Sequence, residues 1–481
     1  MKKNIIVLAG LILGLFFTSC DEYVDIEPKG LVIPRETADL KLTLNNDITF
    51  PTTSRHLWFM DDDIFIADAR HAYIQGNGLM GTYIPEIYGF KDEIYDEDEV
   101  DSNWLNNYEN IAVANYVLNQ LPLVNGSESD KLGIEADARF LKSEAYFQLV
   151  GQYSRHYGLG DPNEAETGVP MTTNFGDVSE DLTRRSIQEV YDIMIEDMNF
   201  VVANHPFTLP EHNFKGSVWA AHGMLARIYL HMGQYQLALD NANAAIDIKD
   251  DLIDYPNELP LNAKGSLGRP NRDDFAKTEI MLLRQGTAPF QFAFTPGVGF
   301  GVAHYLYLTP DLEAIFDQTN DMRFTDLTIA DFAAGGARRY KGWVDMSLSA
   351  FVGMTTPEII LIAAECNARL GNTTAAMDNV NYVRLHRINS TDPLIVNLTA
   401  ANDAEALQHA LEEKRRETAF RGVRYFDVKR LNALDNANIS LSRTDFDGAA
   451  VTLPANHAKW AMPIGTAEIN LNPEIKQNPR N

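Results

Sequence analysis

The chain has 481 residues, 45% of them hydrophobic, and its 67 acidic against 40 basic residues give a formal charge of -27. This charge argues against binding to nucleic acid, whose phosphates require clustered lysine and arginine, and against direct contact with an anionic membrane surface. The length predicts a large core, in two or three domains or in one large helical unit.

The first twenty residues have the pattern of a lipoprotein leader. Lys2 and Lys3 form a basic start, residues 5–17 form an apolar run too short to span a bilayer comfortably, and two small residues precede Cys20. We expect residues 1–19 to be removed and Cys20 to be acylated, because several acyl chains together hold a protein on a membrane. The alternative is an ordinary secretion signal with an incidental cysteine. No second apolar segment of spanning length follows, so a soluble, tethered body is expected.

Residues 50–100 show little periodicity and are rich in aromatic side chains. Long loops within a compact body are usually functional or disordered, and disordered segments are poor in aromatics, so this segment is predicted to be functional. Its last part, residues 92–101, holds seven carboxylates in ten residues and is interpreted as a solvated loop. The aromatic residues that crowd the segment include Trp58, Phe59, Phe65, Tyr73, Tyr83, Tyr88, Phe90 and Tyr95.

Helical patterns follow this loop. Apolar residues at three- and four-residue spacing predict helices over residues 103–121 and 135–157. Residues 219–248 predict a helix pair, because two apolar-striped segments are separated at Gly233. Small residues in both halves allow the two helices to approach closely, and these are Ala221, Ala226, Ala238, Ala242 and Ala245.

A second irregular stretch, residues 255–345, leads to a second helix pair. Residues 357–387 repeat the pattern with Gly371 at the turn, and one more helix is predicted over 404–420. Such pairs resemble tetratricopeptide units, which bury their apolar faces only by stacking on neighbours. Cys366 falls within this pattern and is interpreted as a small buried hydrophobic residue, since Cys20 is committed to lipid.

Several segments, in order along nearly the whole chain, resemble the SusD/RagB family. Residues 104–111 (WLNNYENI) with Asn115, and residues 135–147 (EADARFLKSEAYF), resemble its first helices. Residues 413–430 (EKRRETAFRGVRYFDVKR) are close to the family's signature, which is the most specific part of the match. The family's ending is matched by Met462-Pro463-Ile464, Glu468, Asn472-Pro473 and Gln477-Asn478-Pro479.

The resemblance implies a mostly α-helical, SusD-like fold, in which tetratricopeptide-like helix pairs form a scaffold and long irregular loops form the ligand face. It implies a binding protein and not an enzyme. Such a lipoprotein captures polysaccharide or oligosaccharide and delivers it to a TonB-dependent outer-membrane transporter of the SusC type. No cofactor, metal or nucleic-acid partner is expected.

Location and domain organisation are also implied by the resemblance. The acidic residues Asp21, Glu22 and Asp25 resemble the signal that exports such lipoproteins to the cell surface, although its clearest version begins with a lysine that this sequence lacks. The protein is therefore expected on the outer membrane, lipid-anchored and facing outward. The expected divisions are a signal peptide at 1–19, a lipidated tether at 20–30, and a body at 31–481 with regions over about 31–235 and about 270–481.

The signature residues and three tryptophans are interpreted as structural. Charges at three- and four-residue spacing on one helix support each other, and a second group of charges is expected to lock a helix end to the scaffold. The residues interpreted in this way are Glu413, Arg416 and Glu417, then Arg424, Asp427 and Arg430, and, as core side chains, Trp104, Trp219 and Trp460.

Loop aromatics are the candidates for sugar binding. The C–H faces of pyranose rings stack on aromatic rings, while sugar hydroxyls require polar partners. Trp58 is favoured because it lies outside any helical stripe, beside Asp61, Asp62 and Asp63, which are expected to accept hydroxyl hydrogen bonds. The alternative for each aromatic is that it pins a loop to the scaffold. Further candidates are Tyr73, Gln75, Asn77, Tyr83, Tyr305, Tyr307 and Trp343.

Two sharper hypotheses concern Asp61 to Asp63. A calcium site would use their oxygens, but the spacing does not follow the Asp-x-Asp-x-Asp-Gly loop. A glycosidase needs two carboxyl groups about 5 to 9.5 Å apart, which adjacent residues rarely provide. The sequence has no metal-ligand histidine spacing, Gly-rich phosphate loop or Gly-x-Ser-x-Gly elbow. The rivals to glycan capture are RagB-like peptide capture, a surface glycosidase, and a scaffold that binds only the transporter.

Overall fold

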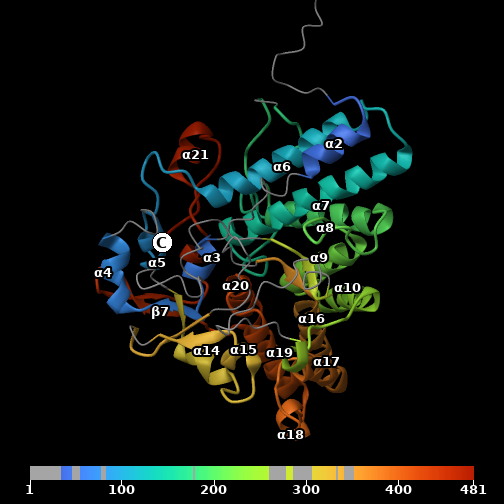
Figure 1. Cartoon of the computed structure of the whole chain (residues 1–481). Coiled ribbons are helices and arrows are strands. Elements are labelled where there is room, and N and C mark those ends of the chain that lie inside the picture. Colours follow the sequence, from blue (N-terminus) through green and yellow to red (C-terminus); the bar gives the residue numbers. More distant parts are fainter. Residues whose placement is uncertain are drawn as a thin grey trace, which may run out of the picture.

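The structure is a computed structural model of the whole chain, and it describes residues 34–45, 55–76, 83–176, 179–258, 278–284, 306–331, 334–340 and 352–481. Helices dominate this part of the chain and the strands are short (Figure 1), which confirms the mostly α-helical class expected from the sequence. None of the helices found there combines the length and the hydropathy that crossing a membrane requires.

The first half of the chain stacks its long helices in chain order. The helices are α2 (Thr37–Leu44), α6 (Ser102–Gln120), α7 (Glu128–Tyr153) and α8 (Ile187–Asn204), with α2 packed on both α6 and α7. Polar caps determine where they begin. Asp101 accepts the N–H of Asn103 at 3.0 Å, and Ser127 accepts the N–H of Asp130 at 3.1 Å. Because Ser127 caps it, α7 begins seven residues before the predicted start at residue 135.

Both predicted helix pairs are confirmed. They are α9 (Val218–His231) with α10 (Tyr235–Ile248), and α16 (Thr356–Arg369) with α17 (Thr373–Leu385). Gly233 and Gly371 adopt φ angles of +73° and +83° at the two turns, a conformation that favours glycine. The five alanines that predicted close approach are fully buried. α10 packs on α16, and α19 (Asp403–Glu417) packs on α16 and α17, so the pairs form one continuous stack.

Short elements lie on the other side of the molecule in Figure 1. The short helices are α3 (Arg55–Phe59), α4 (Asp68–Gly76), α5 (Tyr83–Tyr88), α14 (Pro310–Ile315) and α15 (Met322–Thr325). An antiparallel sheet accompanies them, in the order β1 (Ile64–Ile66), β3 (Leu306–Leu308), β5 (Arg338–Tyr340) and β4 (Thr328–Ala330). Two strand pairs are β2 (Ile280–Leu282) with β6 (Met354–Thr355), and β7 (Leu441–Thr444) with β8 (Ala450–Leu453). The remaining helices are α11 (Tyr255–Glu258), α18 (Pro393–Val396), α20 (Arg424–Asp435) and α21 (Thr466–Leu471), with a 3-10 turn at Ala458–Trp460.

One large apolar core joins the helix stack to these short elements. Trp104, Trp219 and Trp460 are buried in it, which confirms their interpretation as core side chains. Cys366 is fully buried as well, and burial raises the pKa of its thiol to about 12, so it is an inert hydrophobic residue as expected.

The signature helix α19 is held by buried ion pairs from distant segments. Glu413 accepts Arg416 at 2.7 Å on its own helix, and also Arg323 of α15 at 2.6 Å. Glu417 accepts Arg387, beyond the end of α17, at 3.0 Å. Burial raises the pKa of Glu417, but the guanidiniums of Arg387 and Arg323 outweigh burial and hold that pKa below its ordinary value. The signature charges are therefore structural, as predicted, although most of their partners lie outside the helix.

Two charges of the second signature group, Asp427 and Arg430, form the predicted lock, whereas Arg424 pairs with Asp62. Arg430 donates to both carboxylate oxygens of Glu365 on α16, at 2.6 and 2.9 Å. Asp427 accepts Lys414 of α19 at 2.9 Å. These bonds tie α20 to α16 and α19, where all four side chains are buried. Charges in such surroundings are retained only when they are paired.

Candidate functional site

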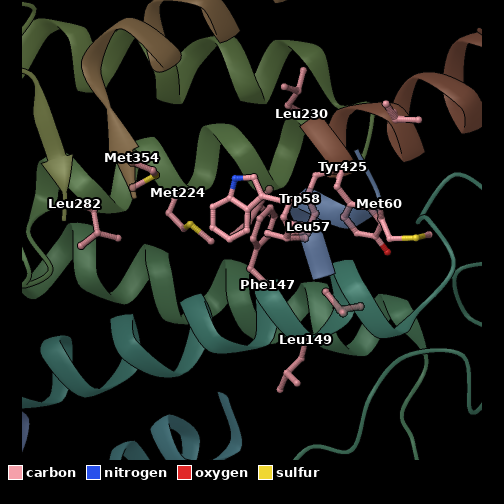
Figure 2. Close-up of a cluster of buried hydrophobic side chains, with 14 of the residues drawn as sticks. Leu57, Trp58, Met60, Phe147, Leu149, Met224, Leu230, Leu282, Met354 and Tyr425 are labelled. Atoms are coloured by element: carbon pink, nitrogen blue, oxygen red, sulfur yellow. The ribbon is translucent and has the colours of Figure 1, made fainter. Parts of the chain in front are cut away.

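Trp58 does not lie at a ligand-facing surface, and its interpretation as a sugar platform is corrected. The side chain is only 1% exposed and lies among Phe147, Met224 and Tyr425 in the core (Figure 2). Its indole N–H donates to the carbonyl oxygen of Phe420 at 3.2 Å. The alternative interpretation is therefore correct for this residue, which pins the segment after residue 54 to the helical scaffold.

The acceptor role expected of Asp61 and Asp63 is also corrected. Both carboxylates are buried, and arginines of the C-terminal region approach the triplet. Asp62 accepts two hydrogen bonds from Arg424, each 2.7 Å long, and Asp63 accepts the Nε–H of Arg415 at 2.6 Å. Burial, followed by the charges of the two neighbouring aspartates, raises the pKa of Asp61 well above its ordinary value. The triplet is thus a junction between segments distant in sequence.

The calcium and glycosidase hypotheses lose their support at the same place. Oxygens of the three carboxylates lie within 4.8 Å of one another, which suits a cation by distance alone. The guanidiniums of Arg415 and Arg424 already pair with Asp63 and Asp62, and a bound metal cation would have to displace them. Asp61 and Asp63 are also buried and Asp62 is only partly exposed, so a sugar cannot pass between these carboxyl groups.

The remaining candidates are divided between the surface, the core and the part of the chain that is not described. Tyr83 is buried against the ring of Tyr95, with centroids 5.5 Å apart, so its role as a sugar contact is corrected. Gln75 is exposed on α4. The candidates that lie outside the described residues are the side chain of Tyr73, and Asn77, Tyr305 and Trp343.

One face of the four-stranded sheet is the best candidate site in the described structure. Phe65, Tyr307, Arg339 and Ile329 are successive cross-strand partners, so their side chains share one face of the sheet. The rings of Phe65 and Tyr307 lie 5.8 Å apart. Tyr307 is buried beneath this face, whereas Phe65 and Arg339 are partly exposed and Ile329 is exposed.

A polar cluster surrounds the hydroxyl of Tyr307 on this face. Tyr307 donates its hydroxyl hydrogen to Asp331 at 2.9 Å, and Arg70 of α4 donates to Tyr307 and to Asp331, each at 3.3 Å. Burial, reinforced by Asp331, raises the pKa of Tyr307 to about 12 even though Arg70 lowers it, so the hydroxyl keeps its proton. The cluster holds α4 against β3.

Arg339 provides a donor next to this cluster. Its Nη1 is buried and has no hydrogen-bond partner among the described residues, and burial lowers the pKa of its guanidinium. Nη1 itself is too buried to reach a ligand, but the Arg339 side chain is partly exposed on the face that also carries Phe65. A guanidinium donates hydrogen bonds to sugar hydroxyls while the C–H face of a sugar packs on an aromatic ring, so this pair of side chains suits a sugar. Asp331 supplies the carboxylate of this cluster, and it is engaged by Tyr307 and Arg70.

Sequence reasoning named Phe65 and Tyr307 but not Arg70, Arg339 or Asp331. The strands are only three residues long, and β1 pairs with a strand more than 230 residues away. No local pattern of that length identifies a strand.

Comparisons with known proteins agree with the fold. Residues 74–230 match a family described as "Starch-binding associating with outer membrane", and residues 346–480 match the SusD family, so that together the matches span more than half of the chain. SusD-like protein P2 of Formosa agariphila is 23% identical over 90% of this chain and 91% of its own.

Solved structures are similar over nearly the whole chain. A SusD superfamily protein of Bacteroides thetaiotaomicron has a TM-score of 0.72 at 18% identity, covering 92% of this chain and all of its own. A laminarin binding SusD-like protein has a TM-score of 0.63 at 18% identity, covering 93% and 99%. Two family matches, a full-length relative and this shared architecture lead to one conclusion: the chain belongs to the SusD/RagB family.

Proposed function

We propose that the protein captures a polysaccharide or oligosaccharide at the cell surface and passes it to a TonB-dependent transporter of the SusC type. The family description, with starch binding and outer-membrane association, supports this function, as does the laminarin binding of a protein with the same fold. The observation that carries the proposal is the sheet face of Phe65, Tyr307 and Arg339, which combines a ring, a guanidinium and a hydrogen-bonded support.

Binding without catalysis is the activity that this face supports. Hydrolysis of a glycosidic bond needs two carboxyl groups placed on opposite sides of the bond. Asp331 is a single carboxylate and is engaged by Tyr307 and Arg70. The function proposed is therefore capture of an intact glycan, and the energy for uptake would come from the transporter.

Removal of the ring or of the guanidinium at this face is expected to weaken glycan binding. Phe65→Ala and Arg339→Met should each lower the affinity for laminarin or starch oligosaccharides by about 1–3 kcal/mol, by analogy with stacking of bases on aromatic side chains. The measurement is calorimetry on the full chain in detergent. Phe175→Ala is the matched control, because this ring is 53% exposed and lies against Tyr116 of α6.

Three results would contradict the proposal. Unchanged glycan affinity in both Phe65→Ala and Arg339→Met would show that the sheet face is not the glycan site. Binding of peptides in place of glycans would support the RagB-like alternative. Release of reducing ends from the bound glycan would show that the protein hydrolyses the glycan and does not only capture it.

A lipid anchor at Cys20 is the second part of the proposal. Acyl chains on this residue would hold the body at the membrane, and residues 20–36 would link them to α2. Cys20→Ala should release the protein from membrane fractions while the fold, followed by circular dichroism, stays unchanged. A variant that still sediments with membranes in high salt would contradict the anchor.

A further inference from the structure

A cavity of about 370 Å³ lies on the helix-stack side of the molecule, away from the sheet face. Its walls come from α2, from the start of α7 and from residues 205–216, which join α8 to α9. Figure 1 shows α2 near one end of the molecule, far from α4 and α14. The volume is within the range of small-molecule sites, about 300–1,000 Å³.

The cavity wall is held in place by contacts around His205. The side chain of His205 is only 3% exposed, with Nε2 3.1 Å from the carboxylate of Asp137 on α7. Its Nδ1 accepts the N–H of Phe207 at 3.1 Å, which fixes the direction of the following chain. Gly133 allows this segment to approach α7, since a Cβ there would lie 3.2 Å from Cγ of Pro206. The cavity is therefore preformed, which lowers the cost of binding.

The lining combines one accessible ring with charges of both signs. Phe207 is 42% exposed at the cavity. Lys41 and Lys215 present ammonium groups and Glu211 presents a carboxylate, and no ion pair involving these three is formed among the described residues. Asp130 adds a carboxylate that accepts the hydroxyl hydrogen of Ser127 at 2.6 Å. Donors, acceptors and a flat apolar surface thus face the same space.

This chemistry selects a neutral, hydroxyl-rich ligand. An anion would meet the carboxylates of the lining and a chain of net charge -27, and a cation would meet the two lysines. A hydroxyl group both donates and accepts, so it pairs with ammonium and carboxylate groups alike. The apolar C–H face of a sugar ring would rest on Phe207.

We infer that the cavity formed by α2, α7 and residues 205–216 is a second carbohydrate-binding site, which takes a short neutral oligosaccharide independently of the sheet face. The choice of ligand class rests on the proposed function. α2 begins at Thr37, 17 residues after Cys20, so this site lies at the tethered end of the body. A polysaccharide that reaches both sites gains avidity, because its second contact is intramolecular.

Calorimetry of the full chain in detergent with laminaritriose and maltotriose tests the inference. Wild-type protein should bind at two sites, and Phe207→Ala should weaken one of them about 5- to 100-fold. Ala38→Leu should block the same site, because Ala38 is an exposed position of α2 that lines the cavity. Phe65→Ala should weaken the other site by a similar factor and leave this one intact.

Matched controls separate loss of the site from loss of the fold. Ala404→Leu changes the second residue of α19, as Ala38→Leu changes that of α2, and both positions are exposed. Phe175→Ala removes an exposed ring elsewhere. A single site that Phe65→Ala weakens and Phe207→Ala leaves unchanged would overturn the second site and keep the proposed function. Absence of sugar binding in wild type would overturn both.

Discussion

Trp58→Ala is expected to lower the free energy of unfolding by about 3–5 kcal/mol and to leave glycan affinity unchanged. The indole is 1% exposed and packs against Phe147 and Met224, so its removal opens a cavity in the core (Figure 2). The carbonyl of Phe420 also loses the hydrogen bond that the indole N–H donates at 3.2 Å. Urea unfolding followed by circular dichroism, with calorimetry on laminarin, measures the two effects separately.

Trp58→Phe provides the graded control for this result. It keeps an apolar ring in the same space but removes the indole N–H, so it should destabilise the fold clearly less than alanine does. The opposite pattern, with stability preserved and sugar affinity reduced in Trp58→Ala, would restore Trp58 as a ligand contact. It would also show that this segment leaves the core when the ligand binds.

Arg387→Met is expected to have an effect of similar size, about 3–5 kcal/mol, by a different mechanism. Arg387 is fully buried and donates to both oxygens of Glu279, at 2.9 and 3.1 Å, and to Glu417 at 3.0 Å. Glu417 keeps Arg323 in the variant, at 2.9 Å. Among the described residues, the carboxylate of Glu279 then keeps only the N–H of Ile253 at 3.0 Å, so a buried charge loses its compensation.

A double variant distinguishes charge from packing. Arg387→Met combined with Glu279→Gln removes the unpaired charge and should recover a large part of the lost stability, measured by urea unfolding. Lys476→Met is the surface control, because Lys476 and Glu166 are 69% and 37% exposed and such pairs contribute little. Equal losses in the single and double variants would show that Arg387 acts through its volume and not through its charge.

The scaffold could be predicted because its signals are local. The pairs around Gly233 and Gly371 were visible as apolar stripes interrupted at a glycine, and both turns adopt the positive φ that glycine allows. A helix closes its hydrogen bonds within a few residues, so its sequence contains most of what is needed to recognise it. The leader up to Cys20 and the domain limits remain predictions, since the structure does not test them.

The candidate site could not be predicted in the same way. Trp58 was favoured because no helical stripe includes it, yet it lies in the core under contacts from α7 and α20. Asp62 and Asp63 looked like free acceptors, but Arg424 and Arg415, more than 350 residues away in sequence, neutralise them. Polar and aromatic residues in a loop suit both a ligand and a packing contact, and only their distant neighbours distinguish the two.

The sequence alone determined the family, the helical class and the order of the helix pairs, because motifs and periodicity extend over neighbouring residues. The tertiary structure decided which side chains face outward. It placed Phe65 beside Tyr307 and Arg339 across three short strands, and it closed a cavity between α2 and the segment containing Phe207. These arrangements depend on contacts between segments far apart in the chain, which no local pattern encodes.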